Sequence, residues 1–278
     1  MIPNVRISKE RMKGYVLMKK AFATMAAVVI SAAVMTACGG KVPENTVHSI
    51  DDLNGKKIGV QQGTTGDTLA SDEYGKTNVE KYNKYADAVQ SLKQGKVDAV
   101  IIDNDTANAF VRKNDDIQIL DEGFADEEYA IAMNLDNTDL QAEINSALDE
   151  LKKDGTLDAI KSYYDGESAG ENKFTPDPDA DTSKGKLVMA TNAEFPPYEY
   201  KEGSDIVGFD VDMMTAVCQK LGYELEIDNI LFNSIIPAVK SGKADVGVAG
   251  MSVTEDRKQN VLFSDPYTTT HLVVMVRK

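Results

Sequence analysis

Hydrophobic and polar positions repeat twice in the same order along the chain. Short apolar runs begin at Lys57 and at Lys186, and a polar loop follows each of them. Farther on, a helical pattern closed by glycine leads into a strand of β-branched residues, over 92–101 and again over 239–248. This repetition predicts two related α/β units, each a sheet flanked by helices, whose ligands bind beyond the carboxyl ends of the strands.

Three other segments complete the pattern. Residues 128–134 and 271–278 read as strands that could bridge the two units, and apolar residues at helical spacing over 140–164 predict a long helical run. A stretch rich in Pro, Asp, Gly and Ser from 165 to 184 predicts a linker. Along the chain, the first α/β unit is therefore followed by a bridging strand and a helical run, then by the linker, the second α/β unit and a final bridging strand.

The first 38 residues have the pattern of an export signal. Lys19 and Lys20 precede an uncharged run, 21–37, that ends in small residues before Cys38. Residues 35–38 resemble a lipobox, in which Cys38 is acylated and becomes the first mature residue. An uncleaved membrane helix is the alternative, but spanning a bilayer typically takes ~20 apolar residues. Met18 is a second candidate for the translation start.

The net charge of −15 excludes one large class of partner, because binding to nucleic acid requires clustered Lys and Arg. Loss of the leader would remove six basic residues and one acidic residue. The remaining surface would be strongly acidic, and anionic lipids repel such a surface. Stable attachment to the membrane would therefore depend on acylation of Cys38. Cys218, the other cysteine, lies in an apolar helical stretch and is expected to fill the core.

Three polar features lie where predicted strands lead into loops. The loop 63–66 opens a helix whose first N–H groups favour an anion, unless it is an ordinary capped loop. Arg257 offers a planar fork suited to a carboxylate, unless it pairs with a neighbouring acid on the surface. Asp103 ends a strand and either receives an ammonium group or caps the next helix through Thr106.

Aromatic residues complete the candidate site. Phe195 and Phe232 are expected in loops directly after strands, where they either fill the core or form the walls of a ligand pocket. His48 and His271 are isolated from other potential ligands, so no metal site is predicted. No phosphate-cradling loop or nucleophile motif occurs, and no cofactor is expected.

With these residues assembled, residues 186–278 resemble the N-terminal lobe of the family 3 extracellular solute-binding proteins, the amino-acid-binding components of ABC importers. The motifs that carry the resemblance are residues 190–200, 207–212, 235–238, 249–258 and 263–267. Residues 50–164 resemble the rest of the same family. The resemblance implies an α/β, two-lobed, periplasmic-binding-protein-like (type II) fold, circularly permuted because the second lobe comes first.

The expected organisation follows from this permuted order. It comprises 1–38 as lipoprotein signal, 39–47 as tether, 48–127 as second lobe, 128–164 as returning hinge strand and final helices packing on the first lobe, 165–185 as linker, and 186–278 as first lobe ending in a hinge strand. The strand 128–134 is then expected to be the only covalent crossing between the lobes. A monomer is expected; the rival is a fragment of a tandem fusion that completes its fold by swapping between chains.

The resemblance also implies the roles of individual residues. Arg257, with backbone N–H groups near Ser252 and Thr65, would hold the ligand's α-carboxylate. Asp103, with the Gly250 carbonyl and the Ser252 hydroxyl, would hold its α-ammonium group. The predicted substrate-binding residues are Gln61, Gly63, Thr64, Thr65, Asp103, Asn192, Phe195, Phe232, Gly250, Ser252 and Arg257. In this arrangement the two phenylalanines sandwich the ligand side chain, and the two amides read its polar end.

The expected function is a protein without catalytic activity, lipid-anchored at the outer face of the cell membrane, that captures a polar amino acid and delivers it to a permease. Many basic-amino-acid binders of the family carry Asp where Asn192 stands. Glu194 would supply the missing charge if it turned inward, so the choice between a basic ligand, glutamine and cystine stays open. The alternatives are an extracytoplasmic sensor, and a dehydratase-like enzyme that needs an acid with a raised pKa beside the ligand.

Overall fold

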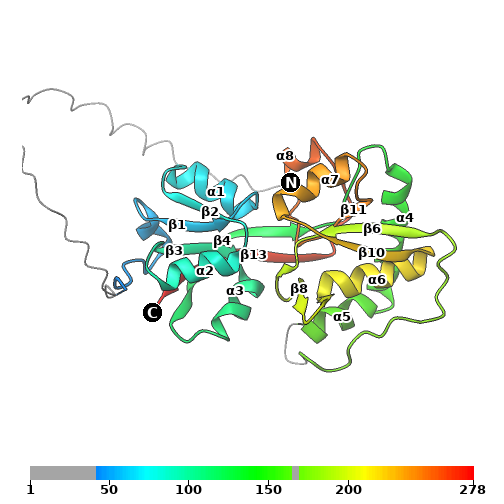
Figure 1. Ribbon diagram of the computed structural model, residues 1–278, viewed down its shortest axis with the longest axis horizontal. Helices are drawn as coiled ribbons and strands as arrows, with labels where there is room; N and C mark the ends of the chain where they lie inside the picture. The colour runs from blue at the N-terminus through cyan, green and yellow to red at the C-terminus, as the bar shows by residue number, and fades with distance from the viewer. Residues whose placement is uncertain (1–41, 165–168) are drawn as a thin grey trace, which may run out of the picture. The chain divides into compact units, whose positions relative to one another are not determined.

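The computed structural model describes residues 42–164 and 169–278, so the predicted export signal and Cys38 lie outside the described residues. Two five-stranded sheets, each with its own helices, form two lobes (Figure 1). We call lobe I the sheet that contains β1 with helices α1–α3, and lobe II the sheet that contains β6 with helices α4–α8. Within the described residues, no helix combines the length and the apolar character needed to cross a membrane.

Lobe I is a mixed sheet with the order β2-β1-β3-β13-β4. Its strands are β1 (Ile58–Gln61), β2 (Val79–Tyr82), β3 (Ala99–Asp103), β4 (Ile117–Tyr129) and β13 (Thr268–Arg277). Its helices are η2 (Ile50–Leu53, a 3₁₀-helix), α1 (Thr65–Tyr74), α2 (Tyr85–Lys93) and α3 (Asn104–Val111). The strands β1, β2 and β3 are parallel, and β13 runs antiparallel to β3 and β4. The central β1 and β3 are buried along their whole length, as expected for parallel strands covered on both faces.

Lobe II repeats this topology with the order β10-β6-β11-β5-β12. Its strands are β5 (Ala132–Met133), β6 (Lys186–Thr191), β10 (Glu224–Asn229), β11 (Val246–Gly247) and β12 (Leu262–Phe263). The helices are α4 (Thr138–Lys153), α5 (Thr156–Tyr164), α6 (Phe209–Leu221), η3 (Phe232–Ser234), α7 (Ile235–Lys240) and α8 (Glu255–Lys258). A small separate sheet comprises β7 (Glu194–Phe195), β8 (Glu199–Glu202) and β9 (Asp205–Val207). In both sheets the fourth place is taken by an antiparallel strand that arrives from the other lobe, so the two-lobed α/β prediction is confirmed.

Both crossings between the lobes are covalent. The first runs from β4 to β5, and the second runs from β12 to β13, which pairs with β4 from Thr268 opposite Tyr129 to Arg277 opposite Ile117. Figure 1 shows β4 and β13 side by side where the lobes meet. The expectation of a single covalent crossing is therefore wrong, because β13 has already entered the sheet of lobe I before the chain ends.

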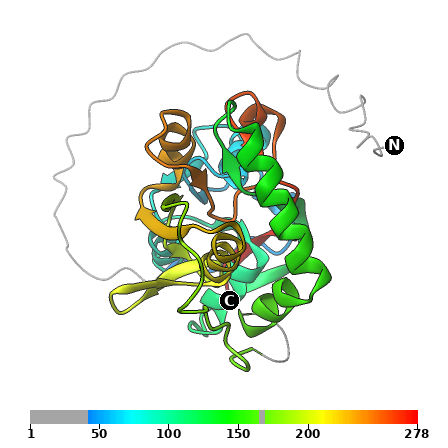
Figure 2. The same cartoon turned by 90° about the vertical axis from the view of Figure 1, so that its right-hand side faces the viewer.

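Two predicted elements differ in extent from those observed. The strand expected over 128–134 is divided between β4, which starts at Ile117, and the short β5. Acidic residues over 121–128 hid the early part of β4, which tolerates them because most are exposed on an edge strand. The helical run expected over 140–164 is interrupted at Gly155, which has a φ of +81°, a backbone conformation that glycine adopts more readily than other residues. The run is therefore divided into α4 and α5. Both α4 and α5 pack against α6 in lobe II (Figure 2, green and yellow).

The start of the described chain lies against lobe I. Val47 is fully buried, and a Cβ added at Gly95 would meet the ring of Pro43 at 2.4 Å. The Arg277 guanidinium donates through Nε to the Pro43 carbonyl at 3.3 Å, next to the end of β13. Within the segment expected to be a tether, Pro43 and Val47 therefore contact lobe I, while residues 42–44 and 46 are exposed.

Candidate functional site

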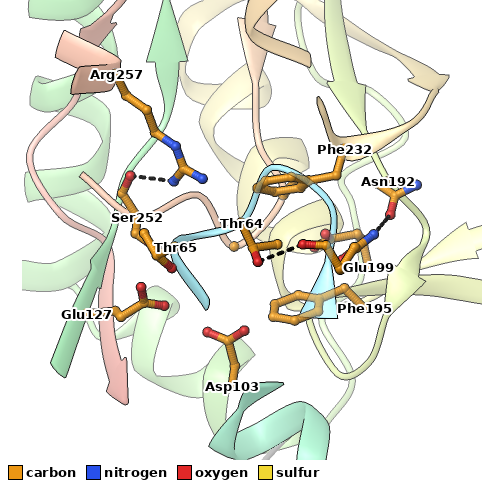
Figure 3. A pocket seen from close by; sticks show the side chains of 13 residues that line it. Thr64, Thr65, Asp103, Glu127, Asn192, Phe195, Glu199, Phe232, Ser252 and Arg257 are labelled. Carbon is orange, nitrogen blue, oxygen red and sulfur yellow. Dashed lines mark hydrogen bonds between the residues drawn. The ribbon is translucent and has the colours of Figure 1, made fainter. Parts of the chain in front are cut away.

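A small cavity lies between the lobes, at the carboxyl ends of the parallel strands (Figure 3). Ten of the eleven predicted substrate-binding residues line it: Gln61, Thr64, Thr65, Asp103, Asn192, Phe195, Phe232, Gly250, Ser252 and Arg257. The eleventh, Gly63, is outside the lining but accepts a hydrogen bond from Arg257 through its carbonyl. Three further residues line the cavity that the sequence did not indicate: Glu127, Glu199 and Ala249.

Arg257 lies on the short helix α8, where the Thr254 hydroxyl accepts a hydrogen bond from the Arg257 backbone N–H at 3.2 Å. Its guanidinium donates to the Ser252 carbonyl at 2.7 Å and, across the lobes, to the Gly63 carbonyl at 3.0 Å. It also lies 5.5 Å from the ring centre of Phe232. Burial lowers the pKa of Arg257 from its usual value. The alternative of a surface ion pair is therefore wrong, since the side chain is only 8% exposed and its fork is held at the cavity.

The first turn of α1 faces Arg257 from lobe I. Thr64 caps this helix by accepting a hydrogen bond from the Asp67 N–H at 3.2 Å, and the Thr65 hydroxyl lies 3.5 Å from that of Ser252. The first N–H groups of a helix lack partners within the helix, and they attract an anion. Gly63 has a φ of +84°, and a Cβ there would meet Asn233 of lobe II at 3.0 Å. Glycine therefore permits the close approach of this turn to lobe II.

Asp103 ends β3 and is 5% exposed. Its carboxyl accepts a hydrogen bond from the Tyr129 hydroxyl and does not cap α3. Burial is the main cause that raises the pKa of Asp103 well above its usual range, and the nearby Glu127 carboxylate raises it further. Among the described residues, no basic side chain forms a salt bridge with Asp103, and Arg257 lies elsewhere in the lining of the same cavity.

Two aromatic rings form the walls of the cavity. Phe195 lies in β7 and Phe232 in η3, so both are in short regular elements and not in the loops that we expected. A Cβ added at Gly250 would lie 2.5 Å from the Phe195 ring, which explains glycine at that position with its φ of +53°. Phe195 stacks on Tyr198 with ring centres 5.4 Å apart, and its centre lies 6.0 Å from that of Tyr85 in lobe I.

Gln61 and Asn192 lie at another side of the cavity and form a hydrogen bond across the lobes. Gln61 also donates to the Asn83 carbonyl at 3.0 Å, and Asn192 donates to the Ile230 carbonyl at 2.8 Å. Glu194 does not turn inward. It forms an ion pair with Lys84 of lobe I at 2.6 Å and is not part of the cavity lining.

The acids that the sequence did not indicate are nearly or fully buried. Glu127 is 8% exposed and belongs to an acidic run that is typical of a solvated surface. The in-and-out alternation of a strand over 126–129 is the one sequence signal that could have distinguished Glu127 from its exposed neighbours.

Glu199 is fully buried beside Asp210, and neither of its carboxyl oxygens has a hydrogen-bond partner among the described residues. Burial, with the Asp210 carboxylate second, raises the pKa of Glu199 well above its usual range. Burial also raises the pKa of Asp210 to about 6.

The lobes contact one another on several sides of the cavity. Besides the bonds of Arg257 and Gln61, the Tyr198 hydroxyl of lobe II donates to Asp105 of lobe I. These contacts describe a closed cleft with a guanidinium and a helix start at one end, carboxyl groups beside them, aromatic walls and two side-chain amides. A closed cleft lined in this way offers complementary groups to a small polar molecule.

Comparisons with known proteins indicate the class of protein. Residues 187–278 match the family model described as bacterial extracellular solute-binding proteins, family 3. The chain is 44% identical to the arginine-binding extracellular protein ArtP of Bacillus subtilis, over 36% of this chain and 39% of that protein. It is 38% identical to a probable histidine-binding protein of Neisseria gonorrhoeae, over 39% of this chain and 41% of that protein. It is 34% identical to the L-cystine-binding protein TcyJ of Escherichia coli, over 44% of this chain and 47% of that protein.

Two solved structures are similar over shorter stretches. An ancestral arginine-binding protein bound to arginine is 48% identical, with 30% of this chain and 38% of that chain covered and a TM-score of 0.30. The arginine-bound form of domain 1 from TmArgBP is 39% identical, with 34% and 82% covered and a TM-score of 0.30.

The matched stretches span less than half the length of these three relatives. The resemblance of residues 187–278 to the family 3 solute-binding proteins is confirmed. These three relatives are named for binding arginine, histidine and cystine.

Proposed function

We propose that the protein is an extracytoplasmic, lipid-anchored receptor of an ABC importer, which captures a polar amino acid in the cleft and delivers it to the membrane permease. The observation that carries this proposal is the convergence of Arg257 and the start of α1 on one end of the cavity, with Asp103 beside them and Phe195 and Phe232 as walls. An amino acid offers a carboxylate, an ammonium group and a side chain, and this cleft has a complementary partner for each.

Closure of the cleft follows from where these partners lie. Arg257 is in lobe II and Asp103 in lobe I, so both charges of a zwitterion are matched only when the lobes are together. The ligand therefore shifts the population of the protein towards the closed form. The permease would distinguish this loaded form from an open one by the relative position of the two lobes.

The polar amides favour a hydrogen-bonding side chain on the ligand. Gln61 and Asn192 together offer donors and acceptors but no charge, which suits glutamine as well as the guanidinium of arginine. Two similar proteins are named for arginine binding, and an ancestral relative was solved with arginine and with glutamine. We therefore place L-arginine and L-glutamine first among the candidate ligands.

The lobe order supports a circular permutation. Arg277, at the end of β13, donates to the Pro43 carbonyl in the segment before η2, so these two parts of the described chain lie side by side in lobe I. A single chain also completes both sheets, which supports a monomer over a swapped dimer. Because both crossings are intact, the permuted order leaves the hinge with two covalent strands.

A thermal-shift screen of the purified protein against the twenty amino acids tests the binding function. A ligand that binds only the folded form raises the melting temperature progressively with its concentration. We expect such a rise with a polar or basic amino acid and no chemical change of the ligand on prolonged incubation. A melting temperature indifferent to all twenty would contradict the proposal, and conversion of the ligand would indicate an enzyme.

The anchor has its own test. Expressed in bacteria with labelled fatty acid, the full chain should incorporate label and partition with membranes, and Cys38→Ala should do neither. Cys218→Ala is the matched control, because Cys218 is buried and its thiol has a pKa raised to about 12 by burial. Label that persists in Cys38→Ala would exclude Cys38 as the attachment site.

A further inference from the structure

The cavity holds more carboxyl groups than the two charges of an ordinary zwitterion require. Asp103 and Glu127 face the same space from neighbouring parts of lobe I, and both are more than nine-tenths buried (Figure 3). Among the described residues, neither forms a salt bridge. Burying an unpaired charge is costly, so two such carboxylates side by side indicate that a cation, or a proton, belongs between them.

The surroundings of the pair are polar, and Arg257 is the basic group among the described residues that line the cavity. On its other side Glu127 borders a groove that is also lined by Asp126, Glu128 and His271. The titratable and charged groups around it are Tyr129 on β4, Tyr85 on α2, Tyr198 and Glu199 at β8, and Arg257 on α8. Arg257 is already bonded to the Ser252 and Gly63 carbonyls, and its remaining donors are those suited to the ligand's carboxylate. The Tyr129 hydroxyl donates a hydrogen bond to Asp103. No donor among the described residues forms a hydrogen bond with the Glu127 carboxylate.

On the basis of the proposed function, we propose that Glu127 and Asp103 together bind the α-ammonium group of the ligand, which replaces a proton that Asp103 holds beside the Glu127 carboxylate in the free protein. The proton leaves to the solvent when the ammonium group enters. The pair with one proton carries a net charge of −1, and two carboxylates beside one ammonium group carry the same −1, so the net charge buried at this position does not change.

Glu127 lies close to the point where the chain connects the two lobes, so binding of a cation at this position can affect the hinge. Glu127 lies on β4 two residues before Tyr129, which pairs with Thr268 where the chain passes between the lobes. Asp103 lies at the end of β3, and Tyr129 donates to it. A cation held by both acids therefore ties β3 to the first crossing strand at the point where closure occurs.

Isothermal titration calorimetry tests the exchange on the full chain, with L-arginine and L-glutamine as probes. Titrations at one pH in buffers of different ionisation enthalpy give the number of protons released. We expect release of up to about one proton per ligand, and an affinity that rises with pH until Asp103 is ionised in the free protein. Binding without any proton exchange between pH 5 and 8 would overturn the proposal and leave the amino-acid-binding function intact.

Variants separate the role of Glu127 from a general effect of charge. Glu127→Gln should release fewer protons and bind roughly tenfold more weakly, since the ammonium group loses a charged partner. Glu128→Gln is the matched control, because it makes the same change one residue along the strand on an exposed side chain. Glu127→Asp, which keeps the carboxylate, should retain proton release.

The outcomes remain distinct if folding or binding fails. Circular dichroism establishes that each variant is folded, and Glu127→Asp provides the readout if Glu127→Gln is not. Proton release and affinity in Glu127→Gln equal to those of Glu128→Gln would overturn the role of Glu127. Absence of heat with every amino acid, in wild type as in variants, would instead overturn the proposed function itself.

Discussion

Gln61 of lobe I and Asn192 of lobe II are joined by a hydrogen bond, in which Gln61 Nε2 donates to Asn192 Oδ1 at 2.8 Å. The two residues are 131 positions apart in the chain, and both are almost fully buried. The amide of Asn192 is oriented by its own donation to the Ile230 carbonyl. The polar end of the cavity therefore exists only when the lobes are closed, and its hydrogen-bonding pattern is set by both.

Asn192→Asp should shift the ligand preference towards L-arginine. The new carboxylate can still accept from Gln61, and it offsets a second positive charge on the ligand. We expect the ratio of arginine to glutamine affinity to rise roughly tenfold, as a charged hydrogen bond replaces a neutral one. Stability should fall by about 1–3 kcal/mol because the Ile230 carbonyl loses its donor. Asn229→Asp, which adds the same charge on an exposed residue, should leave the ratio unchanged in calorimetric titrations.

Arg257→Ala should abolish measurable amino-acid binding. The ligand's carboxylate would be buried without its guanidinium partner, at a cost of ~2–5 kcal/mol. The Gly63 carbonyl would also lose a bond that holds α1 near lobe II. Calorimetry with the ligand from the thermal-shift screen measures the effect. The matched control is Lys258→Ala on the same helix, whose side chain is half exposed, and an equal loss there would contradict the assignment.

Asp210→Asn should change how stability depends on pH. Burial raises the pKa of Asp210 from 3.8 to about 6, so the folded state binds this proton more tightly than the unfolded chain. Asp210 therefore adds stability as the pH falls from 6 towards 4, and this contribution, at most about 3 kcal/mol, is lost as the pH rises through 6. Urea unfolding at several pH values should show a flatter profile for Asp210→Asn. The exposed Asp205→Asn should keep the wild-type profile.

Arg277→Ala should destabilise lobe I. The guanidinium donates to the carbonyls of Leu92 and Val97 at 2.8 and 2.7 Å, near the end of α2, and is 5% exposed. Its loss removes the charged donor from both carbonyls, although the Leu92 carbonyl still accepts from the Gly95 N–H. We expect a cost of about 1–3 kcal/mol in the free energy of unfolding. The exposed Lys278→Ala should have little effect in the same urea titration. A stable Arg277→Ala would mean that β4 and β3 alone hold the end of the chain.

Much of the site could be predicted because its residues follow local patterns. Arg257 lies after a strand on the first turn of a short helix, and Asp103 ends a run of β-branched residues. Such positions follow from the chain's own periodicity together with the rule that strand ends face the binding crevice. The loop 63–66 was predictable for the same reason, since Thr64 caps the helix that it opens.

The local pattern could not reveal which acids are buried. Glu127 and Glu128 are adjacent and chemically identical, yet one lines the cavity and the other is exposed. Their difference depends on the register of β4 with β13, a strand more than 130 residues away. The raised pKa of Asp103 likewise depends on burial by both lobes and on Glu127.

The sequence by itself determined the two α/β units and the chemistry available at each strand end. These properties depend on periods of two and 3.6 residues and on residue type, which are local. Tertiary structure decided that both crossings are covalent, that Pro43 and Val47 contact lobe I, and that Gln61 meets Asn192. Those outcomes depend on pairing between distant segments, because desolvation and hydrogen bonding are fixed by what each side chain finally packs against.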